Sequence, residues 1–198
     1  MNFNKRIVLF LATGFYSGRI PFAPGTFGSA VALPLCFMLS LVNSWVAAGI
    51  TLAVIFFSIR IAGLAEKMLN TNDPGCIVID EIAGMMVALL GLPFNPFSAV
   101  AGFVIFRFFD ILKPFPIRVL DQRLSGGAGI VLDDVLAGVF ANLVLRTAFY
   151  CYYLIWWLVQ HFDREVAEKL KIEKQPENES LQKKKSGLRE NVEAIVVA

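Results

Sequence analysis

Five apolar segments joined by short polar connections restrict the fold of this chain more than any other feature of its sequence. The chain is 57% hydrophobic and only 17% charged, whereas soluble domains average about 45–50% apolar and about 25% charged residues. Because a helix of about 20 apolar residues can cross a bilayer, this pattern predicts helices that have lipid among their surroundings. We therefore expect an all-α, multi-helix integral membrane bundle. The expected helices cover approximately residues 26–42, 45–65, 80–90, 97–112 and 130–159.

The N-terminal part of the chain is apolar but repeatedly interrupted. Residues 7–30 contain Gly14, Pro21 and Gly25 among other glycines and prolines, which favour turns over regular helix. We expect a broken Gly/Pro loop here. The first long helix is expected to begin near Thr26, because a threonine hydroxyl can cap exposed backbone N–H groups.

The C-terminal part changes abruptly in composition. The last apolar segment, 130–159, is too long for one straight crossing, and its sequence leaves open whether it tilts, bends or forms a hairpin near Arg146. Residues 163–198 contain eight Lys or Arg and eight Asp or Glu, a composition that buries little apolar surface. We predict a membrane-embedded domain over residues 1–160 and a charged, partly disordered tail over residues 161–198.

Lysine and arginine are distributed unevenly over the connections. Cationic connections alternate with the connections near residues 43–44 and 91–96, which contain no Lys or Arg. By the positive-inside rule, the cationic connections face the cytoplasm, which predicts a multi-pass protein. The net charge of +2 gives no indication of nucleic-acid binding, and the oligomeric state stays open. The loop cations are Lys5, Arg6, Arg19, Lys67, Lys113, Arg118 and Arg123.

Five carboxylates lie against the apolar segments, although a charge at bilayer depth costs at least roughly 2.5–3.5 kcal/mol. They fall at the cytoplasmic ends of three expected helices, so we expect them to meet at one depth. Like charges held close repel one another, and a divalent cation would remove that repulsion. Oxygen ligands favour Mg²⁺, Mn²⁺ or Ca²⁺ over zinc, and the single histidine, His161, follows the last apolar segment. The five are Asp80, Glu81, Asp110, Asp133 and Asp134.

Cationic and hydroxyl side chains accompany these carboxylates on the same side. Arg107 and Lys113 each stand three residues from Asp110, a spacing that makes helical neighbours. Carboxylates with a metal ion and a basic clamp are typical of phosphoryl chemistry, and donors at a helix start suit phosphate. The candidate phosphate-binding residues are Thr26, Ser29, Arg107, Lys113 and Arg118.

Each of these features also has a structural interpretation. The acidic pairs 80–81 and 133–134 can cap their helices at the positive end of the dipole, and Arg107 with Asp110 can form an ordinary ion pair. From a different class, a divalent cation transporter or channel also uses intramembrane carboxylates. A transporter would place them near the midplane rather than at helix ends beside cations, so their position favours the enzyme.

Four segments carry a resemblance to a known family. The chain reads GFYSGRIPFAPGTFGS at 14–29, IVIDEIAGM at 77–85, AGFVIFRFFDILKPFPIR at 101–118 and GGAGIVLDDVLAGV at 126–139. In this order they resemble the phosphatidylglycerophosphatase A family, over roughly residues 7–145. The combination is specific, whereas any one piece alone would be weak.

The resemblance implies an all-α, Mg²⁺-dependent enzyme of the bacterial inner membrane. Such an enzyme converts phosphatidylglycerophosphate to phosphatidylglycerol and phosphate, with its active site facing the cytoplasm. As a hypothesis, one or two Mg²⁺ are held by Asp80, Glu81, Asp133 and Asp134. Either Asp110 or Asp134 then serves as general base or as covalent nucleophile, and the sequence does not choose between them. The family's N-terminal motif falls on Pro24, Gly25, Thr26, Gly28 and Ser29.

Overall fold

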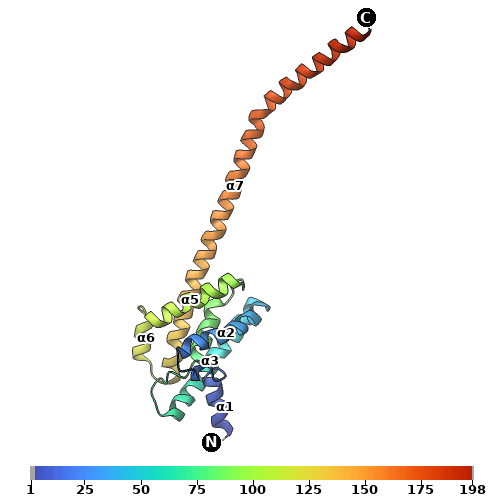
Figure 1. Ribbon diagram of the computed structural model, residues 1–198. Coiled ribbons are helices and arrows are strands. Elements are labelled where there is room, and N and C mark those ends of the chain that lie inside the picture. The colour runs from blue at the N-terminus through green and yellow to red at the C-terminus, as the bar shows by residue number, and fades with distance from the viewer. Residues whose placement is uncertain (1–2, 198) are drawn as a thin grey trace. The chain divides into compact units, whose positions relative to one another are not determined.

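The computed structural model describes the backbone of residues 3–197 and the side chains of residues 5–166, 181–183 and 185. Within this range every regular element is helical (Figure 1), which confirms the all-α prediction. The elements are α1 (Phe3–Ala12), the 3-10 helix η1 (Ser17–Arg19), α2 (Pro24–Ser40), α3 (Ser44–Leu69), α4 (Ile79–Leu89), α5 (Pro96–Leu112), α6 (Ile117–Arg123) and α7 (Gly126–Val197).

The chain divides into two compact units, residues 1–148 and residues 149–198. The first contains α1 to α6 and the beginning of α7, and the second contains the rest of α7. Because α7 is a single helix through Arg146, the last apolar segment forms no hairpin there. That residues 161–198 make a separate, partly disordered tail stays a prediction.

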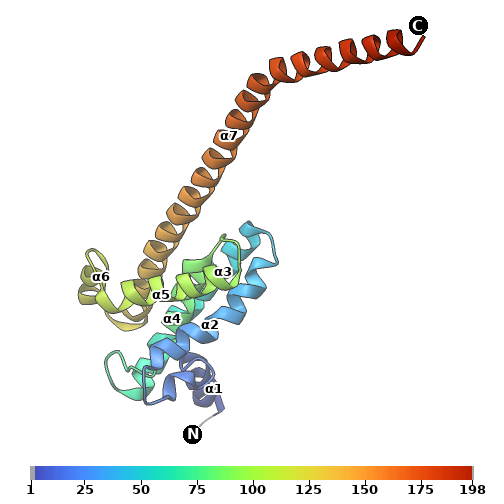
Figure 2. The ribbon, with the colours of Figure 1, turned by 45° about the horizontal axis from the view of Figure 1, so that its top comes forward.

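Helix α4 is the centre of the first unit. It is apolar on all sides apart from its first turn, a pattern that suits a buried helix, and only Glu81 and Val87 of its eleven residues are not fully buried. It packs against α2, α3 and α5 (Figure 2). Its residues also belong to both apolar cores, since Met85 packs with α2, α5 and α7 and Ala83 packs with α1, α3 and α7.

Small residues let α7 approach its neighbours closely. A Cβ atom on Gly138 would lie 2.3 Å from the carbonyl oxygen of Gly84 on α4. A Cβ atom on Gly127 would lie 2.0 Å from the carbonyl oxygen of Ile59 on α3. Helices that pack in lipid use small residues in this way, because backbone contact replaces the hydrophobic effect between them. These contacts place the first turn of α7 directly beside α3, and Gly138, further along α7, directly beside α4.

The outer surface of the first unit is apolar. On α5 the exposed side chains Phe97, Val100, Val104 and Phe108 recur every three or four residues, which makes one apolar helix face. Two helical stretches, Ser44–Leu69 and Gly126–Val166, are long and apolar enough to span a membrane. Contiguous exposed apolar surface marks a binding site or a membrane contact. The surface and these helices indicate that the protein associates with a membrane.

Two short helices stand where the sequence predicted irregular chain. The prediction of a broken loop over residues 7–30 holds for η1 and its flanking turns. However, α1 is regular through Ala12, because Leu9 and Ala12 bury one face against its neighbours. In the expected loop 113–129, α6 forms seven residues and is anchored by the buried Ile117.

Candidate functional site

One end of the first unit contains a cavity of about 650 Å³. Every Asp and Glu among residues 1–162 lines it, eight in all, whereas the lining includes only two cations, Arg107 and Lys113. Such a lining repels an anion unless further positive charge is present. The acids are Glu66, Asp73, Asp80, Glu81, Asp110, Asp121, Asp133 and Asp134.

Three helices begin at this cavity. Pro24 at the start of α2, Asp80 in the first turn of α4 and Gly126 at the start of α7 all line it. The first turn of a helix presents unpaired N–H groups and a partial positive charge. The convergence therefore favours negative groups at this end, whether these are the protein's own carboxylates or a phosphate.

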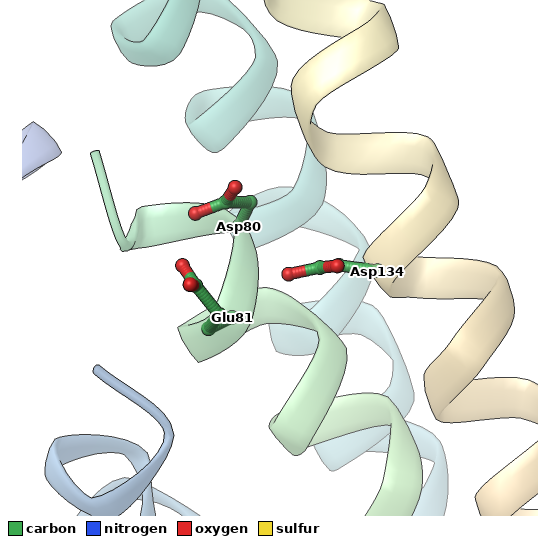
Figure 3. Close-up of side chains that lie close together, drawn as sticks. All are labelled: Asp80, Glu81 and Asp134. Atoms are coloured by element: carbon green, nitrogen blue, oxygen red, sulfur yellow. The ribbon is translucent and has the colours of Figure 1, made fainter. Parts of the chain in front are cut away.

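Asp80 and Glu81 on α4 and Asp134 on α7 line the cavity, and their side chains lie close together (Figure 3). One carboxylate oxygen from each lies within 4.8 Å of the other two. Asp80 and Asp134 are 8% and 4% exposed, and the buried oxygens Asp80 Oδ1 and Glu81 Oε2 have no hydrogen-bond partner among the described residues. Because buried polar atoms without partners are costly, this donor set fits a hard divalent cation such as Mg²⁺, which prefers oxygen ligands.

Arg107 connects α5 to this cluster. Its guanidinium Nη1 forms an ion pair with Asp110 Oδ2, one turn further along α5, and lies 3.9 Å from Glu81 Oε1. Its Nε is buried without a hydrogen-bond partner in the described part of the chain. The structural ion pair considered from sequence is thus present, and the same arginine keeps a donor free beside the carboxylates.

Lys113 joins two further carboxylates at the rim of the cavity. Its Nζ donates to Asp121 Oδ1 on α6 and to Asp133 Oδ2 on α7, each at 2.6 Å. Burial by itself would lower the pKa of Lys113, but these two hydrogen bonds raise it above its ordinary value. The ammonium therefore stays charged at neutral pH. Asp133 faces Lys113 and is not part of the three-carboxylate cluster.

The remaining candidate phosphate-binding residues lie outside the lining. The Ser29 hydroxyl is buried and donates to the carbonyl oxygen of Gly25 at 2.8 Å. Thr26 is partly buried in α2, and Arg118 is exposed on α6. The structure thus brings Arg107, Lys113 and all five predicted acids to one cavity. The catalytic and binding roles of these seven residues stay predictions, as do the roles of Thr26, Ser29 and Arg118.

Sequence reasoning missed three acids that line the cavity: Glu66, Asp73 and Asp121. They lie in the connections outside the expected apolar helices, where an acidic side chain carries no cost of burial in lipid and so did not indicate a site. Desolvation raises the pKa of Asp73. The nearby ammonium of Lys113 lowers this pKa, whereas the negative charges of Asp121 and Glu66 raise it. Because residues 1–162 contain only eight acids, each of them could have been treated as a candidate site residue from the sequence.

Gly25 explains part of the N-terminal motif. A Cβ atom there would lie 2.2 Å from Glu81 Oε1 and 2.9 Å from Arg107 Nη1. The start of α2 can therefore approach these two side chains only because residue 25 is glycine. The close approach brings backbone N–H groups at the start of α2 toward the acidic cluster.

Fold and site together define a class of protein. It is a membrane-associated helical enzyme whose buried carboxylates, arginine and lysine suit the chemistry of phosphate esters. No nucleophile–histidine pair lies in the cavity, since its described lining contains no histidine. The ionisable side chains of this lining are its carboxylates, Arg107 and Lys113.

Comparison with known proteins agrees with this class. A sequence model of the phosphatidylglycerophosphatase A family matches residues 10–149. The phosphatidylglycerophosphatase A of Escherichia coli is 39% identical over 136 residues, or 68% of this chain and 79% of that protein. The Haemophilus influenzae protein of the same name is 39% identical over 137 residues, or 68% and 84%.

A Bacteroides thetaiotaomicron protein with the provisional name phosphatidylinositol-3-phosphatase is 36% identical over 146 residues, 70% of this chain and 91% of that protein. No solved structure matches the chain. The chain belongs to the phosphatidylglycerophosphatase A family, and it is a phosphoric monoester hydrolase.

Gly25→Ala tests the close approach at the cluster. The added Cβ would displace the Glu81 carboxylate and the Arg107 guanidinium. We expect phosphatase activity to fall about 10- to 100-fold, because small misplacements of catalytic groups cost rates of this size. The matched control is Gly75→Ala, which lies on the same cavity but meets no atom within 4 Å. Equal activity of the two variants would contradict this role for Gly25.

Proposed function

We propose that this protein hydrolyses the phosphomonoester of phosphatidylglycerophosphate to phosphatidylglycerol and phosphate in bacterial phospholipid synthesis. The observation that carries the proposal is an acidic cavity lined by the five predicted carboxylates together with Arg107 and Lys113, in a chain of this family. Family membership also favours the phosphatase over the cation transporter or channel considered from sequence.

Mg²⁺ is proposed as the cofactor. Asp80, Glu81 and Asp134 would hold it, because their oxygens converge and two of these lack a partner. When bound, Mg²⁺ neutralises phosphate oxygens and makes water more acidic. Asp133, the fourth predicted ligand, is engaged by Lys113 through Oδ2, but its buried Oδ1 has no hydrogen-bond partner among the described residues.

Three side chains of the cavity would orient the phosphate and accept the proton of the attacking water. Arg107 and Lys113 orient the phosphate through its non-bridging oxygens, since both present charged donors to the cavity. Asp110 lies outside the three-carboxylate cluster, so we assign it as the general base that takes a proton from the attacking water. The ester P–O bond breaks, and the lipid oxygen leaves with a proton from solvent.

The membrane arrangement is also proposed. The cavity lies at the ends of α3 and α5 and the starts of α2, α4 and α7. Residues of the connections between η1 and α2, between α3 and α4 and between α5 and α7 line this cavity, whereas residues near 43–44 and 91–96 line a second one. The positive-inside rule then places the cavity on the cytoplasmic side of the inner membrane, with several helices crossing it.

Phosphate release is the first test. Protein purified in detergent should release inorganic phosphate from phosphatidylglycerophosphate with Mg²⁺, stop releasing it with EDTA and recover when Mg²⁺ is added in excess. Phosphatidylinositol-3-phosphate, which the name of the Bacteroides relative suggests as a second substrate, should be hydrolysed more slowly under the same conditions. Folded protein that releases no phosphate from either lipid would disprove the proposal.

Metal binding is tested apart from activity with Mn²⁺ as a paramagnetic probe. We expect wild-type protein to bind Mn²⁺ and to release it to Mg²⁺. Asp134→Asn should weaken binding roughly 10- to 100-fold, because it removes one ligand of a small set. Asp163→Asn, exposed and outside the cavity, is the control. Unchanged affinity in Asp134→Asn would show that the cation binds elsewhere.

The orientation is tested with single cysteines in a cysteine-free background. Thr71 is exposed on the cavity side of α3, and Val42 is exposed at its other end. A membrane-impermeant maleimide should label Thr71→Cys only in inside-out vesicles and Val42→Cys only in intact spheroplasts. Labelling with the opposite sidedness would invert the proposed topology.

A further inference from the structure

Lys113 occupies an unusual backbone position at the cavity rim. It ends α5 in the left-handed conformation, with φ 42°, and its N–H donates to the carbonyl oxygen of Phe109 at 2.9 Å. Glycine is the common residue at such a helix end, because a side chain strains the backbone there. The structure thus holds a lysine where glycine is the least strained choice, and its ammonium reaches into the acidic lining.

Two carboxylates of different burial hold that ammonium. The Asp133 side chain on α7 is 5% exposed, and the Asp121 side chain on α6 is 38% exposed. Both accept hydrogen bonds from Lys113 Nζ at 2.6 Å. An ammonium has three donors, and the described contacts use two of them. Lys113 is therefore clamped from two sides while one donor remains for a ligand.

We propose that Asp121 is a positioning residue, which holds the Lys113 ammonium at the cavity rim for the substrate phosphate. The inference rests on the proposed function, because it takes the phosphate of the lipid as the ligand of Lys113. Asp121 lies on the short helix α6, whereas the other residues with proposed roles lie on α4, on α7 or on α5 and its C-terminal end. Its carboxylate is the outer of the two that hold Lys113, so it determines how far the ammonium is drawn away from Asp133.

The two possible effects of Asp121 on an anionic substrate have opposite signs. As a negative charge at the rim, it would repel phosphate, and removing it would strengthen substrate binding. As a holder of Lys113, it supports binding, and removing it would let Lys113 collapse onto Asp133 or turn outward. The direction of the change in KM therefore separates the two roles.

We expect Asp121→Ala to raise KM for phosphatidylglycerophosphate about tenfold with kcat changed less than about twofold, because it removes a binding contact rather than a reacting group. Asp121→Glu should restore KM. The comparison is Glu66→Gln, which removes a charge from the same lining at a residue that does not contact Lys113. Its KM should fall or stay the same. A KM that falls in Asp121→Ala as well would overturn the inference.

A second measurement does not depend on turnover. Full-length protein is treated with an amine-acylating reagent at alkaline pH, for long enough that the small neutral fraction of the Lys113 amine reacts. Labelling of Lys113 is quantified by mass spectrometry with and without inorganic phosphate. Phosphate should protect Lys113 in the wild type and fail to protect it in folded Asp121→Ala. Asp121→Asn, which keeps an acceptor oxygen, should show partial protection and serves if the alanine variant does not fold.

The two measurements distinguish a failure of the positioning role of Asp121 from a failure of the proposed function. Equal protection of Lys113 in wild type and in the Asp121 variants would overturn the positioning role, whatever the activity. Protection that depends on Asp121, in a wild-type protein that releases no phosphate from phosphatidylglycerophosphate, would support the positioning role and overturn only the proposed substrate.

Discussion

The mutual repulsion of carboxylates gathered at one end of a helical unit is the interaction on which the rest of the site depends. Eight acids face two cations in one cavity, and several are too buried for water to screen their charges. Three helix starts and the cations Arg107 and Lys113 offset part of this repulsion. The remainder is the repulsion that the proposed Mg²⁺ would offset, and a phosphate ester would bind through that cation.

Close backbone packing sets the distances within this cluster. Asp80 and Glu81 are held on α4, and Gly84, one turn later, lies against the carbonyl oxygen of Asp134 on α7. A side chain at either helix contact would separate α4 from α7, and with them the carboxylates. The glycines of the family-like motifs thus serve geometry more than flexibility. Gly25 acts in the same way for α2, whose start could not otherwise approach Glu81.

Much of this could be anticipated from sequence, for identifiable reasons. Apolar segments correspond to α2, α3, α4, α5 and α7, because a run of apolar side chains has few alternatives to a helix in an apolar environment. The five acids were expected at one end, because they stand at helix ends on the same side of the charge pattern. The short helix α6 was not expected, since its seven residues carry no clear periodicity and depend on the burial of Ile117.

By itself, therefore, the sequence determined the all-helical class, the end of the bundle that carries the charges and the chemistry those charges suit. These follow from composition and spacing along one chain. Only the tertiary structure decided the partners: Asp134 with Asp80 and Glu81, and Asp133 with Lys113 and Asp121. Neighbouring residues on a helix point in different directions, so Asp133 and Asp134 separate according to which helices pack beside α7, and spacing within one segment does not contain that information.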